Sequence, residues 1–152
     1  MKKITIVIVD DHRLVRETWS FILNSDPRFK VIGYCASGEE ALIKIPRLNP
    51  DVVIMDINLP GINGIEATEI LTKSNCASKI LAVSLHTQPK YVLKMLEAGA
   101  LGYVTKNSAK EEMYKAVTEA VSGNLFICEE IRDVVTDLLN MEHREYSYKP
   151  AS

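Results

Sequence analysis

The chain of 152 residues has the length of one domain, and its 47% hydrophobic and 25% charged residues are ordinary for a globular protein. A net charge of -2 gives no overall electrostatic reason to bind nucleic acid or an acidic membrane, and no apolar stretch approaches the roughly 20 residues of a membrane helix. Cys35, Cys76 and Cys128 form neither a Cys-x-x-Cys pair nor a metal spacing, so we expect reduced thiols in a cytoplasmic protein.

Five short apolar segments rich in Val and Ile predict the strands of a parallel sheet. Their hydrophobicity is continuous rather than alternating, which indicates burial on both faces beneath covering helices. The predicted strands are residues 4–9, 31–36, 52–56, 80–84 and 101–104.

The first two helices are predicted between the first three strands. Val15, Trp19 and Leu23 recur at every fourth position, which indicates one buried helix face. Ser37 is expected to cap the second helix, and Pro46 and Pro50 are expected to limit it.

Three further helices follow. The third comes after the Leu59-Pro60-Gly61 turn and Gly64, and the fourth ends at Gly99. Ser108 is predicted to cap the fifth helix, with Glu111 completing a capping box.

This alternation predicts an α/β fold: a doubly wound (βα)5, flavodoxin-like sandwich of three layers around a five-stranded parallel sheet, plus an extra C-terminal helix. We divide the chain at the Gly123-Asn124 break, into residues 1–122 and a helix with a polar tail over 123–152. The extra helix carries an apolar stripe, which we expect to pack on its own domain, with a homodimer interface as the alternative. The stripe consists of Ile131, Val134, Val135, Leu138 and Leu139.

Chemically capable side chains follow four of the predicted strands. Asp10 and Asp11 follow the first strand and Asp56 closes the third, while Ser84 ends the fourth and Lys106 follows the fifth. The carboxyl ends of parallel strands share one edge, where ligands bind. Converging carboxylates repel one another unless a hard cation such as Mg²⁺ joins them. The set therefore predicts an aspartyl phosphate, with the hydroxyl and the ammonium group contacting the phosphoryl oxygens.

Taken singly, these residues have ordinary explanations. An aspartate after a strand is often a turn former, a serine ending a strand is often a satisfied hydroxyl, and a lysine is usually solvated. Their joint occurrence at successive strand ends is what favours a site.

As an ordered set, with the Leu59-Pro60-Gly61 turn, Gly64 and Tyr103, these residues resemble the receiver domain of two-component response regulators over about residues 3–122. The finer pattern is similar to the NarL/FixJ group, whose members carry a LuxR-type helix-turn-helix after the receiver. That pattern consists of Asp11-His12, residues 61–67, Ser84-Leu85-His86, residues 98–103 and residues 123–127.

The resemblance implies a role for each acidic residue. Asp56 is the expected phosphoacceptor. Asp11 and Asp56 are expected to bind Mg²⁺ directly with the backbone carbonyl of Asn58, and Asp10 is expected to bind it through water.

The resemblance also implies a switch. Ser84 and Lys106 are expected to contact the phosphoryl group, and Tyr103 is expected to turn inward when the serine moves. Leu85 stands where smaller residues are common, so its side chain is expected to narrow access to the phosphoacceptor. For His86 there are two interpretations, contact with the mouth of the site or an ordinary surface position, and we favour the second.

The implied partner is a sensor histidine kinase. The group resemblance favours the regulatory half of a transcription factor, although the residues after Asn124 hold too little for a helix-turn-helix. We therefore expect the DNA-binding domain to be absent from this chain and DNA to be bound only through it. The alternative is a stand-alone receiver or a phosphorelay module.

Two rivals keep the fold but change the function. The first is an aspartyl-nucleophile phosphohydrolase, which commonly has a second aspartate two residues after the nucleophile. Asn58 occupies that position, so we expect a switch that assists its own phosphorylation and dephosphorylation, and not an enzyme. The second is an interaction module that is not phosphorylated, which would be expected to have lost an acidic residue or the lysine.

Overall fold

The computed structural model describes residues 2–142, so the predicted polar tail from residue 143 onward lies outside the described part. Six parallel strands form one sheet in the order β2-β1-β3-β4-β5-β6. Their bounds are β1 Ile4–Val9, β2 Phe29–Cys35, β3 Val52–Met55, β4 Lys79–Ser84, β5 Gly102–Thr105 and β6 Phe126–Ile127. The strand order reverses between β1 and β3, which creates the crevice where doubly wound folds bind ligands.

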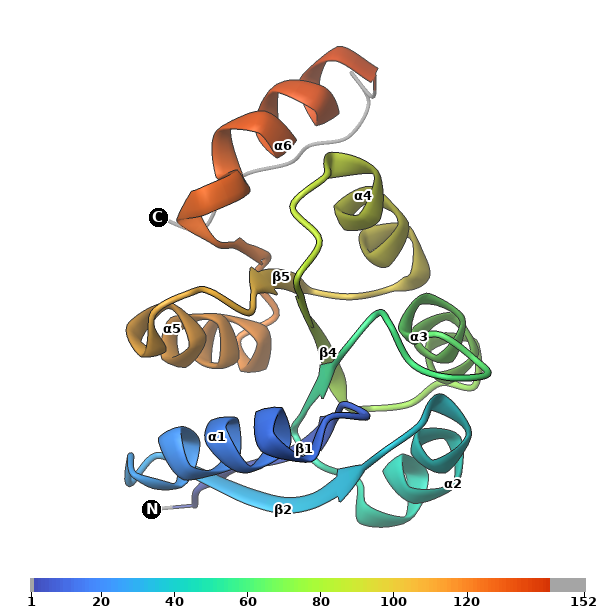
Figure 1. Ribbon diagram of the computed structural model, residues 1–152, viewed down its shortest axis with the longest axis vertical. Coiled ribbons are helices and arrows are strands. Elements are labelled where there is room, and N and C mark those ends of the chain that lie inside the picture. Colours follow the sequence, from blue (N-terminus) through green and yellow to red (C-terminus); the bar gives the residue numbers. More distant parts are fainter. Residues whose placement is uncertain (1, 143–152) are drawn as a thin grey trace.

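Six helices complete the described part of the chain. Their bounds are α1 Arg13–Asn24, α2 Gly38–Leu48, α3 Gly64–Lys73, α4 Pro89–Ala98, α5 Lys110–Val121 and α6 Glu129–Glu142. Figure 1 shows α1 and α5 on one face of the sheet and α2, α3 and α4 on the other. This is the predicted three-layer sandwich. Within residues 2–142, no helix combines the length and the apolar character needed to cross a membrane.

The sheet forms the centre of the hydrophobic core. All four residues of β3 are buried, as are residues 6–9 of β1, so these two interior strands are covered on both faces. Continuous apolar strands of this kind fit a parallel sheet between helix layers. The prediction of buried parallel strands is confirmed. The same core supports the edge of the sheet where the polar residues lie.

The sheet has one strand more than the five predicted. Phe126 and Ile127 of β6 pair in parallel with Gly102 and Tyr103 of β5. A strand of two residues shows no periodicity of its own, and only the neighbouring edge of β5 gives it hydrogen-bonding partners. The sequence after the Gly123-Asn124 break therefore extends the sheet.

Two predictions about helix ends need correction. The second helix continues past Pro46, although proline removes one backbone hydrogen bond, and it ends at Leu48, before Pro50. The fifth helix begins at Lys110 after Ala109, with no side-chain cap. Ser108 instead lies 3.1 Å, oxygen to oxygen, from the hydroxyl of Thr105, so its side chain is occupied by that contact. The Ser37 cap is confirmed, since its hydroxyl accepts a hydrogen bond from the Glu40 N–H.

Helix α3 begins with a capping box that the sequence analysis missed. The Asn63 side chain accepts from the Glu66 N–H at 2.9 Å, and the Glu66 carboxylate accepts from the Asn63 N–H at 3.4 Å. We expect Asn63→Ala to lower the free energy of unfolding by about 1 kcal/mol, because a helix-end N–H loses its partner. Urea denaturation measures this, with Asn63→Ser as a control that keeps a capping oxygen; equal losses in both variants would contradict the capping role.

The extra helix packs on its own domain, as predicted. Ile131 and Val135 of α6 are buried, and α6 contacts α4. Val134 is exposed, so the predicted stripe is only partly covered, and the side chain of Leu139 lies outside the described part. The homodimer alternative remains a prediction.

Candidate functional site

Two buried carboxylates meet where the strand order reverses. Asp10 directly follows β1 and Asp56 directly follows β3, and these strands pair so that Val9 lies opposite Met55. Both aspartates are only 3% exposed, whereas Asp11 is exposed. The predicted convergence of the three acidic residues is therefore present in the fold.

A single lysine bridges the two buried carboxylates. The Lys106 Nζ lies 2.8 Å from Asp10 Oδ2 and 3.2 Å from Asp56 Oδ2. Burial lowers the pKa of Lys106, but hydrogen bonds and charge attraction from the two aspartates outweigh it, so the pKa is raised overall. The lysine is thus held as a cation with its charge directed at the predicted phosphoacceptor.

This lysine does not neutralise both carboxylates. The pKa of Asp56 is raised to about 6, first because burial penalises the charged form and then because of the Asp10 charge. Lys106 and a backbone hydrogen bond from Asn58 oppose the rise without cancelling it. A second cation at this edge would therefore be favoured electrostatically.

The donor set fits a divalent cation. Each of Asp10, Asp11, His12 and Asp56 offers one ligand atom, and the four atoms lie within 4.8 Å of one another. Three of the four donors are carboxylate oxygens, the ligand type that Mg²⁺ prefers. The place of the Asn58 carbonyl as a further ligand stays a prediction.

The sequence analysis gave His12 no role in the site. Its Nδ1 lies 3.3 Å from Asp10 Oδ1 and 3.2 Å from Asp11 Oδ1. Its position next to an aspartate pair was the only available signal. In the structure its backbone N–H also donates to Asp10 Oδ1 at 2.8 Å.

Ser84 is fully buried at the end of β4, the strand that pairs with β3, and its contact with a phosphoryl group stays a prediction. Its Oγ accepts a hydrogen bond of 3.1 Å from the His86 N–H. Its carbonyl accepts from the Lys106 N–H at 2.9 Å, which joins the ends of β4 and β5. The hydroxyl is therefore held by the loop after β4.

Tyr103 occupies an inward position. Its side chain is fully buried, and its hydroxyl donates to the His86 carbonyl at 2.9 Å. Burial raises the pKa of Tyr103 to about 12, so the phenol stays a neutral donor. The buried tyrosine thus anchors the same loop that holds the Ser84 hydroxyl.

His86 is not the ordinary surface residue that we favoured. Its ring stacks on Tyr91 with centroids 3.9 Å apart, and its Nε2 lies 3.0 Å from Asn58 Oδ1. Only the tertiary contact between the loops after β3 and β4 creates this arrangement. The adjacent Leu85 is 64% exposed, and its effect on access to the phosphoacceptor stays a prediction.

Gly64 allows the start of α3 to pass close to the backbone of Asp56. A Cβ at this position would overlap the backbone carbonyl of Asp56, and the Gly64 N–H donates to the Ile57 carbonyl at 2.8 Å. Because the obstructing atoms are backbone, they cannot move aside as a side chain can. A glycine at the start of α3 is therefore required for the position of the acidic loop.

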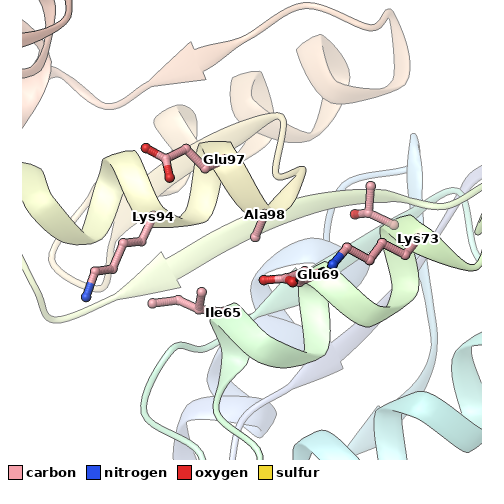
Figure 2. Close-up of a pocket in the computed structure, with 7 residues that line it drawn as sticks. Ile65, Glu69, Lys73, Lys94, Glu97 and Ala98 are labelled. Atoms are coloured by element: carbon pink, nitrogen blue, oxygen red, sulfur yellow. Dashed lines mark hydrogen bonds and ion pairs between the residues drawn. The ribbon is translucent and has the colours of Figure 1, made fainter. Parts of the chain in front are cut away.

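A hollow of about 420 Å³ elsewhere on the surface lacks these features. Figure 2 shows that its charged groups come from α3 (Glu69, Lys73) and from α4 (Lys94, Glu97). Two of them, Glu69 and Lys73, form an ion pair of 2.8 Å. Balanced, exposed charges of this kind have no concentrated acidic character, so the strand-end cluster is the candidate site.

Known proteins share this sequence pattern and this fold. The model of the response regulator receiver domain family matches residues 6–118. The transcriptional regulatory protein DegU of Brevibacillus brevis is 40% identical over 125 residues, which cover 82% of this chain and 53% of DegU. The response regulator UvrY of Escherichia coli is 39% identical over 129 residues, covering 84% of this chain and 59% of UvrY.

Solved structures of response regulators have the same fold as this chain. A LuxR-family response regulator from Aurantimonas sp. has a TM-score of 0.84 and 33% identity, covering 90% of this chain and 98% of that one. The receiver domain of the putative response regulator NarL from Mycobacterium tuberculosis has a TM-score of 0.79 and 31% identity, covering 82% and 100%. The chain spans little more than half the length of DegU and of UvrY. The family match and these relatives show that the chain belongs to the receiver domain family of two-component response regulators, and that its homologues are of the NarL/FixJ type.

Proposed function

We propose that this chain is a phosphorylation switch in which Asp56 accepts a phosphoryl group from a sensor histidine kinase. The observation that carries the proposal is the position of Asp56, which is buried beside Asp10 and hydrogen-bonded to Lys106. Bound Mg²⁺ would supply the positive charge that neutralises the carboxylates and the phosphoryl oxygens. Asp11 and Asp56 are the proposed direct ligands with the Asn58 carbonyl, and Asp10 is the proposed ligand through water.

The chain's own residues perform the rest of the transfer. A carboxylate oxygen of Asp56 forms a bond to phosphorus while the bond between phosphorus and the kinase histidine nitrogen breaks, and that nitrogen keeps the electron pair. Lys106 Nζ, now 3.2 Å from Asp56 Oδ2, would then pair with a phosphoryl oxygen. The Ser84 hydroxyl would donate to another, so each new oxygen charge has a positioned partner.

The loop after β4 is the proposed moving part. When Ser84 turns toward the phosphoryl group, its hydrogen bond from the His86 N–H is lost. The Tyr103 hydroxyl binds the carbonyl of the same histidine, so the ring and the loop are expected to rearrange together. A local change in charge would in this way bias the α4–β5 face between two arrangements.

The mouth of the site is the proposed control on phosphoryl lifetime. Leu85 is exposed in the loop after β4, and His86 Nε2 lies 3.0 Å from Oδ1 of Asn58, two residues after Asp56. Both side chains are positioned to limit the approach of water and of phosphoryl donors to Asp56. Their effect would be on the rates of phosphorylation and dephosphorylation, with the chemistry unchanged.

A transcription-regulator context is supported by the relatives of this chain. DegU is a transcriptional regulatory protein, and the matched part is 53% of its length. We propose that this chain is the regulatory part of a LuxR-type transcription factor, reaching DNA only through an output domain outside these 152 residues. A cytoplasmic location accompanies this proposal and suits the three free cysteines.

The phosphohydrolase alternative fits the site less well. Asn58 stands two residues after Asp56, and its side chain contacts His86. An amide cannot act as the acid and base of a phosphohydrolase. The chain is therefore proposed to be a switch that is itself phosphorylated.

Intact mass spectrometry tests the proposed function. Incubation with Mg²⁺ and acetyl phosphate should add one phosphoryl group, and EDTA should prevent the addition. Peptide mapping should place it on the segment that contains Asp56. An adduct on another residue would overturn the assignment of the site, and a chain that binds Mg²⁺ but forms no adduct would favour an interaction module.

Replacing Lys106 with alanine should separate metal binding from switching. Without the ammonium group, Asp10 and Asp56 lack their shared cation, so Mg²⁺ binding measured by calorimetry should persist or tighten. Phosphorylation should then change the amide NMR signals of residues 84–91 much less than in the parent. Lys94→Ala, at an exposed lysine on α4, is the control; full signal changes in Lys106→Ala would contradict its role.

A further inference from the structure

A buried threonine joins the phosphoacceptor site to the C-terminal helix. Thr105 is fully buried at the end of β5, and its hydroxyl donates to Glu130 Oε1 on α6 at 2.6 Å. The next residue is Lys106, whose ammonium group contacts both buried aspartates. Two neighbouring residues therefore connect the phosphoacceptor to a carboxylate on α6.

The segment that contains Thr105 and Lys106 is fixed against β4. Thr105 pairs with Ser84 across β4 and β5, and the Lys106 N–H donates to the Ser84 carbonyl at 2.9 Å. Peptide planes are rigid, so a displacement of Lys106 and Ser84 toward a phosphoryl group also displaces Thr105. A hydrogen bond that is already short weakens steeply when its geometry changes.

Helix α6 is held at its first turn by contacts from three other elements. The Glu129 N–H donates to Glu112 Oε2 of α5 at 2.7 Å, and Arg132 Nε donates to the Ile127 carbonyl of β6 at 2.9 Å. The third contact is the one between Thr105 and Glu130. Figure 1 shows α6 lying beyond β5 and alongside α4, so the helix covers this edge of the receiver.

We propose that α6 is a latch over the α4–β5 edge, and that phosphorylation of Asp56 releases it through Thr105 and Glu130. This inference rests on the proposed function. In the unphosphorylated state, Thr105 holds the Glu130 carboxylate and the latch is closed. When Lys106 and Ser84 move to the phosphoryl group, that hydrogen bond is lost and the edge beneath α6 becomes available.

Thermodynamic linkage makes the effect reciprocal. If phosphorylation opens the latch, then opening the latch must favour binding of a phosphoryl group or its mimic by the same factor. A charged hydrogen bond of this kind corresponds to a factor on the order of tenfold. Removing the Glu130 carboxylate should therefore raise the affinity for a beryllium fluoride mimic of the phosphoryl group.

Three variants of the full chain test this. Glu130→Ala removes the acceptor, Glu130→Gln keeps an acceptor oxygen and should rescue the contact, and Asp133→Ala removes an exposed carboxylate from the same helix. Hydrogen exchange of residues 129–138 is measured with and without Mg²⁺ and acetyl phosphate, alongside intact mass. Phosphorylation should speed exchange on the order of tenfold in the parent, in Glu130→Gln and in Asp133→Ala. Glu130→Ala should exchange fast from the start and bind beryllium fluoride more tightly.

The outcomes separate the latch from the proposed function. A chain that carries the phosphoryl adduct but keeps unchanged protection of residues 129–138 overturns the latch and leaves the phosphoacceptor standing. Beryllium fluoride affinity that is the same in Glu130→Ala and in the parent also overturns it. Failure to form an adduct overturns the assignment of Asp56 as phosphoacceptor. The latch would then lack the phosphorylation to which it is proposed to respond.

Discussion

Replacing Asp56 with asparagine should abolish phosphorylation of the chain by acetyl phosphate and Mg²⁺. The amide keeps the shape of the side chain but is far less nucleophilic than a carboxylate at phosphorus. Within residues 2–142, Asp10 is the only other carboxylate that is both buried and in contact with Lys106. Intact mass is the measurement. Asp133→Asn, at an exposed aspartate, should behave as the parent. Stable phosphorylation of Asp56→Asn on a different residue would remove Asp56 from its assigned role.

The same variant should be more stable than the parent when metal is removed. Asp56 has its pKa raised from 3.8 to about 6, so the folded chain holds this proton more tightly than the unfolded chain. The associated stability is fully present below pH 3.8 and is lost as the pH rises through about 6. At pH 7.5 in EDTA we therefore expect Asp56→Asn to unfold with a free energy higher by about 1–3 kcal/mol.

Urea denaturation as a function of pH checks this expectation. The parent should lose stability between about pH 4 and pH 6, and the variant should lose much less. Near pH 4 the two chains should be close in stability, because the Asp56 carboxyl of the folded parent is then protonated. Parallel pH profiles would mean that the repulsion between Asp10 and Asp56 is relieved by some other group.

Gly64→Ala, at the first residue of α3, should strongly destabilise the chain. The new Cβ would overlap the Asp56 carbonyl carbon and oxygen, both backbone atoms fixed by the sheet. Relief requires moving either the start of α3 or the phosphoacceptor loop, so we expect a loss of about 2–4 kcal/mol in the free energy of unfolding. Phosphorylation should also slow, because a displaced Asp56 no longer lies against Lys106.

Gly123→Ala is the matched control. A Cβ there meets no atom within 4 Å, although its φ of 79° favours glycine. Its loss should stay near 1 kcal/mol, from backbone strain alone. A Gly64→Ala variant that is no less stable than Gly123→Ala would show that the loop can relax around the new methyl group.

The sequence alone identifies the polar residues of the site because each stands at the end of an apolar strand. These residues are Asp10, Asp11, Asp56, Ser84 and Lys106. In a parallel sheet all such ends meet at one edge, so local pattern places these side chains together. The core strands follow from continuous apolar segments, and most helices follow from hydrophobic periodicity. The predicted cap at Ser108 is wrong because its hydroxyl contacts the hydroxyl of Thr105, a contact that competes with the cap.

Only the tertiary structure decided the contacts between these elements. The two-residue β6 exists because β5 offers it an edge, and the His86 ring is held by its contacts with Asn58 and Tyr91. The hydrogen bond from Thr105 to Glu130 joins residues far apart in the chain, and no periodic pattern in the sequence predicts it. The strand ends that bear the chemistry are a local property of this sequence. The couplings that would turn that chemistry into a switch are not, because they depend on which distant side chains the packed core brings within hydrogen-bonding distance.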